Sequence, residues 1–176
     1  MPIATASQTI GPYWHLLRDD TWSDLTRFGA TGDVITLQGR ITDGAGNLIT
    51  DACVEIWQSS PPVSDVFDGF GRAASNAEGL FSFKTLRPEP VPGASGPMGN
   101  TRQAPHIALT ILARGVTKAL WTRIYFQGDA GHDEDPVLSL IPPARRNTLI
   151  AHQTKPGVWH LDIALQGASE TVFFEI

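Results

Sequence analysis

The residue with the clearest capacity for chemistry is a histidine near the start of an apolar stretch, residues 102–110. In an extended strand, positions i and i+2 point to the same face, so residues 106 and 108 are placed to offer two ligands to one metal ion. His106 supplies an imidazole, but Ala108 supplies no donor. A catalytic metal needs at least three convergent protein ligands, so this stretch alone does not make a metal site.

A second candidate is the run His132-Asp133-Glu134, which has the His-x-Glu spacing of a two-histidine, one-carboxylate iron(II) site. His152 or His160 is available as the third ligand. The run is acidic and precedes Pro136, which favours a solvated loop. A self-sufficient iron(II) oxygenase therefore remains one alternative. The sequence contains neither a Gly-x-Ser-x-Gly nucleophile motif nor a phosphate-binding glycine loop.

Composition narrows the class of protein. The chain has 176 residues, 41% of them hydrophobic and 18% charged, which predicts one globular domain with a substantial core. The net charge of -5 and the scattered basic residues argue against nucleic acid binding. No apolar run approaches the roughly 20 residues of a membrane span, and no secretory signal is visible, so we expect a cytoplasmic protein. The single cysteine, Cys53, is expected to be a small buried hydrophobe.

Most of the chain has the alternating pattern of β-strands. Strands are expected at residues 33–41, 52–57, 80–84, 102–110, 119–126, 159–165 and 171–176. Residues 59–71 and the proline-rich residues 88–100 are expected to be long loops, and residues 142–151 a helix with proline in its first turn. These features predict an all-β fold, an antiparallel β-sandwich with long loops and one short helix.

The beginning of the chain is too apolar for a free tail. Its aromatic and aliphatic side chains include Tyr13, Trp14, Leu16, Trp22 and Phe28. Such side chains normally pack on something, either this domain or a neighbouring chain. We expect residues 1–30 to form an arm that packs on a partner chain and residues 31–176 to form the β-sandwich domain.

Several short motifs, weak individually, occur in an order that resembles the intradiol ring-cleavage dioxygenases. They are residues 7–13 (SQTIGPY), 69–72 (GFGR), 88–92 (PEPVP), 104–107 (APHI), 122–126 (TRIYF), 162–167 (DIALQG) and 170–174 (ETVFF). In that family an antiparallel sandwich carries iron(III) on two tyrosines and two histidines. The iron-bearing chains place one tyrosine in a Pro-x-Pro-Tyr-Pro loop and the histidines as His-x-His on the central strand.

The sequence departs from this pattern at the ligand positions. Val91 replaces the loop tyrosine, Ala108 replaces the second histidine, and residues 59–71 contain no tyrosine; only His106 matches. The resemblance therefore implies an iron-free alpha-type chain, whose partner beta chain holds iron(III). The implied reaction is O2-dependent cleavage of protocatechuate to 3-carboxy-cis,cis-muconate, a step of aromatic degradation through the β-ketoadipate pathway. A metal-free β-sandwich binding or scaffold module, with no enzymatic partner, is the alternative from another class.

The resemblance also implies which residues touch substrate. The family's alpha chains line the partner's pocket with a Gly-Pro segment, which corresponds to Gly11 and Pro12, with Thr9 and Tyr13 beside it. Glycine permits close backbone approach to a planar ring, and proline keeps the turn stiff.

Arg123, in the Thr-Arg-x-Tyr-Phe motif, is the expected partner of the substrate carboxylate. A guanidinium group matches a carboxylate as a bidentate donor. The competing interpretation is that Arg123 pairs with a carboxylate of the sheet, such as Glu55 or Asp162.

Overall fold

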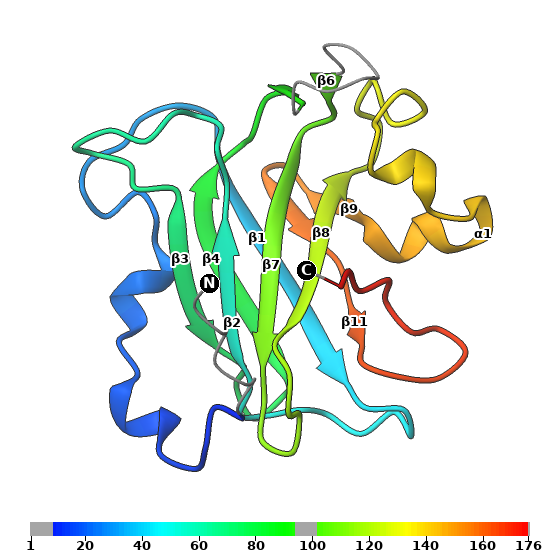
Figure 1. The fold of residues 1–176 in the computed structure, drawn as a ribbon. Coiled ribbons are helices and arrows are strands. Elements are labelled where there is room, and N and C mark those ends of the chain that lie inside the picture. Colours follow the sequence, from blue (N-terminus) through cyan, green and yellow to red (C-terminus); the bar gives the residue numbers. More distant parts are fainter. Residues whose placement is uncertain (1–8, 94–101, 176) are drawn as a thin grey trace, which may run out of the picture.

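The chain folds into a nearly closed, twisted sheet, with short helical segments on two sides of it (Figure 1). The computed structural model describes residues 9–93 and 102–175. Its strands are β1 (Val34–Thr42), β2 (Cys53–Trp57), β3 (Phe70–Ala74), β4 (Leu80–Leu86), β5 (Val91–Pro92), β6 (Arg102–Gln103), β7 (His106–Leu112), β8 (Leu120–Phe126), β9 (Ile150–Lys155), β10 (Val158–His160) and β11 (Ile163–Ala164). Its helical segments are η1 (Trp14–Leu17), η2 (Asp20–Ser23), η3 (Leu138–Leu140), α1 (Pro143–Arg146) and η4 (Asn147–Leu149).

The sheet is mixed rather than antiparallel, so the expected antiparallel sandwich is correct only in its mostly-β content and its one short α-helix. The main path runs β11-β1-β10-β9-β8-β7-β2-β3, and β4 also pairs with β1. Three of these pairings are parallel: β1 with β10, β1 with β11, and β8 with β9. Parallel strands need a long connection, and residues 127–149 provide it by crossing over from the end of β8 to the start of β9.

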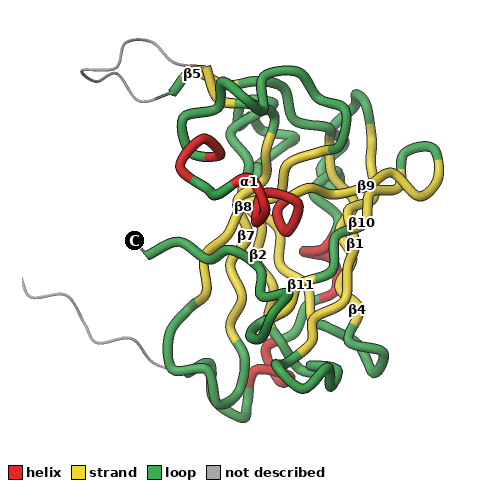
Figure 2. The backbone as a smooth tube through the Cα atoms, turned by 90° about the vertical axis from the view of Figure 1, so that its right-hand side faces the viewer, coloured by secondary structure: helices red, strands yellow, loops and turns green. Residues whose placement is uncertain are grey.

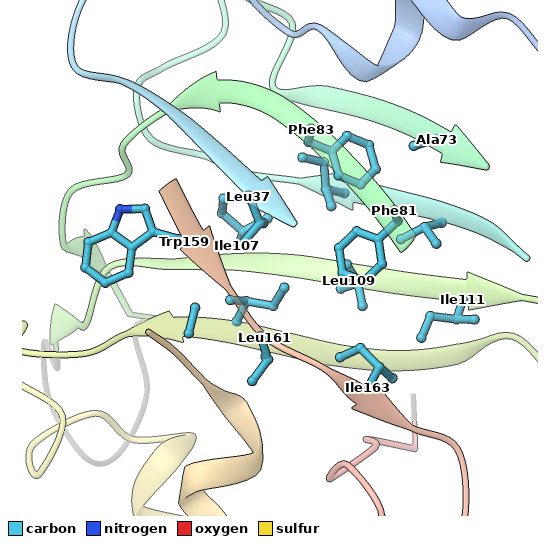
Figure 3. Close-up of a cluster of buried hydrophobic side chains, with 14 of the residues drawn as sticks. Leu37, Ala73, Phe81, Phe83, Ile107, Leu109, Ile111, Trp159, Leu161 and Ile163 are labelled. Carbon is cyan, nitrogen blue, oxygen red and sulfur yellow. The ribbon is translucent and has the colours of Figure 1, made fainter. Parts of the chain in front are cut away.

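Two layers of strands face each other across the main core. Figure 2 shows β2, β7 and β8 in one layer and β1, β4, β9 and β10 in the other. Leu37, Phe81, Ile107, Leu109 and Ile111 fill the space between them, and each is at most 1% exposed (Figure 3). Strand alternation thus separates an inner face from an outer face.

Glycine is required at one close approach within this core. On β1, a Cβ atom at residue 39 would lie 1.8 Å from the carbonyl oxygen of Leu161. Only Gly39 allows β1 and the residues between β10 and β11 to come this close. The single strand expected at residues 159–165 is divided into two in the structure, because β10 ends at His160 and β11 begins at Ile163.

Tertiary pairing also changed some expected elements. The predicted helix at 142–151 ends early, because Ile150 and Ala151 pair with β8 as the start of β9. The expected loop at 59–71 ends in β3, which begins at Phe70 and pairs along the whole of β2. The expected strand at 171–176 is reduced to a single bridge between Phe174 and Trp121, and Ile176 lies outside the described residues.

The proline-rich loop is partly described. Val91 and Pro92 form β5 against β6, whereas residues 94–100 of the expected loop lie outside the described residues. Cys53 is buried as expected, and burial raises the pKa of its thiol to about 12. In the part of the chain that is described, no helix is long and apolar enough to cross a membrane.

The segment before β1 packs partly on its own domain. Leu25 is fully buried in the main core, and the Trp22 ring meets Phe70 edge-on at 5.9 Å. The residues Tyr13 and Leu16 are 71% and 69% exposed to solvent. The packing of residues 1–30 on a partner chain stays a prediction, and the exposed side chains are those available for it.

Candidate functional site

The candidate site lies on the outer face of the layer that contains β7, the face turned toward the viewer in Figure 1. The pairing of β3, β2, β7 and β8 aligns side chains in rows across this face. One row is Phe70, Trp57, Ala108 and Arg123, and the next is Arg72, Glu55, Thr110 and Trp121. Members of a row project on the same side because directly paired residues share a face.

A hollow of about 290 Å³ opens in these rows around Ala108. Trp57 and Trp121 border it and are 50% and 42% exposed. The sequence resemblance assigned Ala108 to the position of the family's second histidine, and that assignment stays a prediction. The single methyl group of Ala108 leaves the space between the two tryptophans open.

His106 begins β7 at one end of the same face. Its Nδ1 lies 2.8 Å from the carbonyl oxygen of Ala104. Since a carbonyl oxygen only accepts, Nδ1 carries the proton and donates. Burial lowers the pKa of His106 below its ordinary value, so the ring is neutral at pH 7. Nε2 is therefore the one nitrogen of His106 whose lone pair is free to bind a metal ion.

Tyr125, directly opposite His106, is fully buried and bound to Asp135. The Tyr125 hydroxyl donates to Asp135 Oδ1 at 3.1 Å. The carboxylate of Asp135, also fully buried, accepts from the backbone N–H groups of Ala104, Val137 and Leu138 at 2.8–2.9 Å. Burial raises the pKa of Tyr125 well above its ordinary value, so the phenol stays protonated.

The Tyr125–Asp135 pair was missed by sequence reasoning, which treated the acidic run before Pro136 as a solvated loop. The available signal was Asp135 directly before Pro136 and a short 3-10 turn, where a carboxylate can accept from exposed backbone donors. The pair ties the loop after β8 to the start of β7.

Arg123 lies in the first row, opposite Ala108. Its Nη1 donates to Oε1 of Gln103 at 2.6 Å, and Gln103 pairs with Val91 in the small β5–β6 sheet. The three positions that the resemblance predicted to be former ligand positions, Val91, His106 and Ala108, therefore lie near Arg123.

The sheet carboxylates proposed as alternative partners of Arg123 are bound elsewhere. Glu55 pairs with Arg72. Asp162 accepts from the backbone N–H of Arg40 at 2.8 Å and lies 2.7 Å from His160 Nε2. Among the described residues neither carboxylate pairs with Arg123, and the Arg123 guanidinium donates to the amide oxygen of Gln103 instead.

The predicted substrate contacts of the N-terminal segment lie toward the other end of β7. The Thr9 hydroxyl donates to the carbonyl oxygen of Ala113, just past the end of that strand, at 3.3 Å. Ala113 is five residues beyond Ala108, which corresponds to about 17 Å along a strand. Gly11 has φ +78°, a left-handed conformation that favours glycine, and Pro12 beside it is exposed.

The predicted site residues thus form two groups. Arg123 lies near His106 and Ala108, whereas Thr9, Gly11, Pro12 and the exposed Tyr13 lie in the N-terminal segment. Within one chain the structure does not bring the two groups together.

The described side chains do not fit an iron centre. Val91 and Ala108 carry no donor atoms, so Nε2 of His106 is the one nitrogen that these three positions could offer to a metal ion. Over residues 9–93 and 102–175, no three His, Cys, Asp or Glu side chains converge as a metal site. The proposed iron(II) set also fails on geometry, since His152 contacts Gln127 and His160 contacts Asp162, and neither joins His132 and Glu134 in such a group.

Comparison with known proteins places this geometry in a family. A dioxygenase family model matches residues 15–160. The alpha chain of protocatechuate 3,4-dioxygenase from Pseudomonas putida is 36% identical over 97% of this chain and 96% of its own length. The corresponding alpha chain from Burkholderia cepacia is 34% identical over 98% and 97%. The beta chain of that enzyme from Burkholderia cepacia is 28% identical over 94% of this chain and 77% of its own length.

Solved structures share the fold. Hydroxyquinol 1,2-dioxygenase from Pseudomonas putida DLL-E4 superposes with a TM-score of 0.64 at 18% identity, over 80% of this chain and 58% of that chain. The dioxygenase domain of a carbohydrate-binding fusion protein from Streptomyces sp. SirexAA-E gives a TM-score of 0.61 at 23% identity, over 83% and 88%.

Proposed function

The chain belongs to the intradiol dioxygenase family, and from this premise we propose that it is the iron-free alpha subunit of a heteromeric protocatechuate 3,4-dioxygenase. The complex would cleave protocatechuate with O2 to 3-carboxy-cis,cis-muconate, as a step of aromatic degradation in the cytoplasm. Its partner would be a beta chain, and the two would assemble as a hetero-oligomer of αβ units.

One observation supports the assignment of iron to the beta chain and not to this chain. Residues 106 and 108 lie on the same face of β7, as two metal ligands would, but Ala108 and Val91 have no donor atoms at the positions that the resemblance assigns to ligands. The iron(III) of the complex would therefore be held by the beta chain. The resemblance of this chain to both alpha and beta chains supports a pairing of two related folds.

The residues of this chain would act by binding and orienting the substrate. Gly11 and Pro12, with Thr9 and Tyr13 beside them, would line the pocket of the partner. The exposed turn at Pro12 suits such a contact, because no described element of the same chain covers it. Arg123 would bind the substrate carboxylate, and its present bond to a neutral amide oxygen leaves the guanidinium charge uncompensated by that partner.

Co-expression with a beta chain from the same organism tests the proposal. The purified complex should contain about one iron per αβ unit and cleave protocatechuate, whereas this chain purified alone should hold no stoichiometric iron and show no activity. A matched control is the beta chain expressed alone under the same conditions.

Two outcomes would contradict the proposal. About one iron per isolated alpha chain would overturn the assignment of the metal to the partner. Failure to form any complex with a beta chain would favour the alternative, a metal-free binding or scaffold module.

A further inference from the structure

Arg123 carries a positive charge that no carboxylate of the described residues balances. Three other arginines of the described chain each form an ion pair with an acid: Arg27 with Asp68, Arg72 with Glu55 and Arg87 with Asp129. The partly buried Arg123 instead donates to the neutral amide oxygen of Gln103 at 2.6 Å. Its charge is screened less than that of a fully solvated arginine, so it acts on the groups beside it on this face.

The guanidinium lies among the three positions that the resemblance assigns to metal ligands. Arg123 is directly opposite Ala108 in the pairing of β7 with β8, and His106 lies two residues before Ala108 on the same face. Gln103, which accepts from the guanidinium, pairs with Val91. Paired residues project on the same side of a sheet, so the strand register itself sets Arg123 in this place.

The imidazole of His106 responds to this charge. Burial is the main cause of the lowered pKa of His106, and the positive charge of Arg123 lowers that pKa further. The hydrogen bond to Ala104 and the charge of Asp135 oppose these effects without reversing them. A charge that disfavours a proton on this imidazole also disfavours a metal ion there, and more strongly, because the metal ion has the higher charge.

We propose that Arg123 excludes metal ions from this face, because its guanidinium is a permanent cation among residues 91, 106 and 108. The donors that Val91 and Ala108 lack are then only part of the reason why the site does not fit iron. Restoring those donors would not create a metal site while Arg123 remains. The inference goes beyond the proposed function, since it concerns this chain alone and needs neither the beta chain nor the substrate.

Restoring the donors and changing the charge separately tests the proposal. The donor variant Val91→Tyr/Ala108→His adds a phenol and a second imidazole beside His106. A further variant adds Arg123→Leu, which is neutral and carries no donor atom. The probe is Zn²⁺, which binds imidazole and does not change its oxidation state, titrated into the full chain by calorimetry. We expect the donor variant to bind Zn²⁺ at least about 100-fold more weakly than the donor variant with Arg123→Leu.

The matched control is the donor variant with Arg123→Lys, which keeps the positive charge and changes the shape of the side chain. It should bind Zn²⁺ as weakly as the donor variant that retains Arg123. The unaltered chain and the single variant Arg123→Leu measure Zn²⁺ binding at other surface groups. Circular dichroism verifies that each variant is folded.

Three outcomes would overturn the proposal. Equal binding with arginine and with leucine at position 123 would mean that the missing donors alone exclude the metal ion. Tight binding in the donor variant with Arg123→Lys would show that charge is not the cause. No Zn²⁺ binding by the folded donor variant with Arg123→Leu would mean that removing the guanidinium does not open the site.

A second measurement needs no added donors. In an NMR titration of the full chain, Arg123→Leu should raise the pKa of His106, whereas Arg123→Lys should change it little. An unchanged pKa in Arg123→Leu would show that the guanidinium does not act on the imidazole, and would also overturn the proposal. Both measurements use this chain alone. Failure of the proposed function would appear elsewhere, as an unaltered protein that forms no active, iron-containing complex with a beta chain.

Discussion

The two faces of β7 differ in burial and in the chemistry of their side chains. On the inner face Ile107, Leu109 and Ile111 are at most 1% exposed and belong to the main core. On the outer face His106 carries an imidazole, and Ala108 lines a hollow. One strand therefore carries a fully buried apolar face and an outer face with a single imidazole.

Under the proposed function, this difference means that the fold does not depend on a metal site on its outer face. Burying an aliphatic side chain contributes about 1.5–3 kcal/mol, and three such side chains lie on one short strand. A lost ligand on the outer face costs the fold no such burial. The inner face can thus keep a scaffold that serves a partner's active site.

The sharpest contrast is expected from truncation on the inner face. Leu109→Ala should lower the free energy of unfolding by about 2–5 kcal/mol, because it leaves a cavity in the core. Chemical denaturation of the αβ complex measures this. Ala108→Gly, on the outer face of the same strand, is the control and should cost about 1 kcal/mol or less. Equal losses would mean that the two faces do not divide in this way.

A smaller loss is expected at the covered end of the outer face. Tyr125→Phe removes a hydroxyl that donates to the buried carboxylate of Asp135, and a hydrogen bond to a charged group contributes about 1.5–3 kcal/mol. The free energy of unfolding should fall by that amount, while the iron content of the complex should not change. Loss of iron with normal stability would instead place Tyr125 in the metal chemistry.

Arg123 tests whether the open part of the outer face serves substrate. In the αβ complex, Arg123→Ala should lower kcat/KM for protocatechuate by about 10-fold or more, which corresponds to about 1.4 kcal/mol. Catechol, which lacks the carboxylate, should be nearly unaffected. Equal losses for both substrates, or dissociation of the complex, would show that Arg123 stabilises the structure through Gln103 instead.

The smallest effect concerns pH. Burial lowers the pKa of His106 in the folded chain below the ordinary value of 6.5. When the pH falls below about 6.5, the unfolded chain therefore binds a proton at His106 more readily than the folded chain does. Stability should therefore fall as the pH decreases below about 6.5, by at most about 1.4 kcal/mol per unit for this one group. His106→Asn should show a weaker dependence over that interval in urea denaturation. An unchanged slope would mean that His106 titrates normally.

Residue identities determined much of this picture without coordinates. Alternation of apolar residues predicted most of the strands, including Ile35, Leu37 and Ile41 on the buried side of β1. The ordered motifs predicted the family, which the comparisons confirmed. The missing donors at Val91 and Ala108 follow from side-chain chemistry alone, because neither side chain contains an atom that can bind a metal.

Tertiary structure decided what depends on distant pairing. Local periodicity does not specify which strands become neighbours, so the parallel pairing of β8 with β9, and with it the early end of the predicted helix at Ile150, came from the fold. The burial of Tyr125 against Asp135 and the separation of Thr9 from Arg123 likewise depend on how the chain crosses itself. The hollow around Ala108 forms because the register of the strands places Trp57 beside Ala108 and Trp121 beside Thr110. That register is set by backbone hydrogen bonds between residues far apart in the sequence.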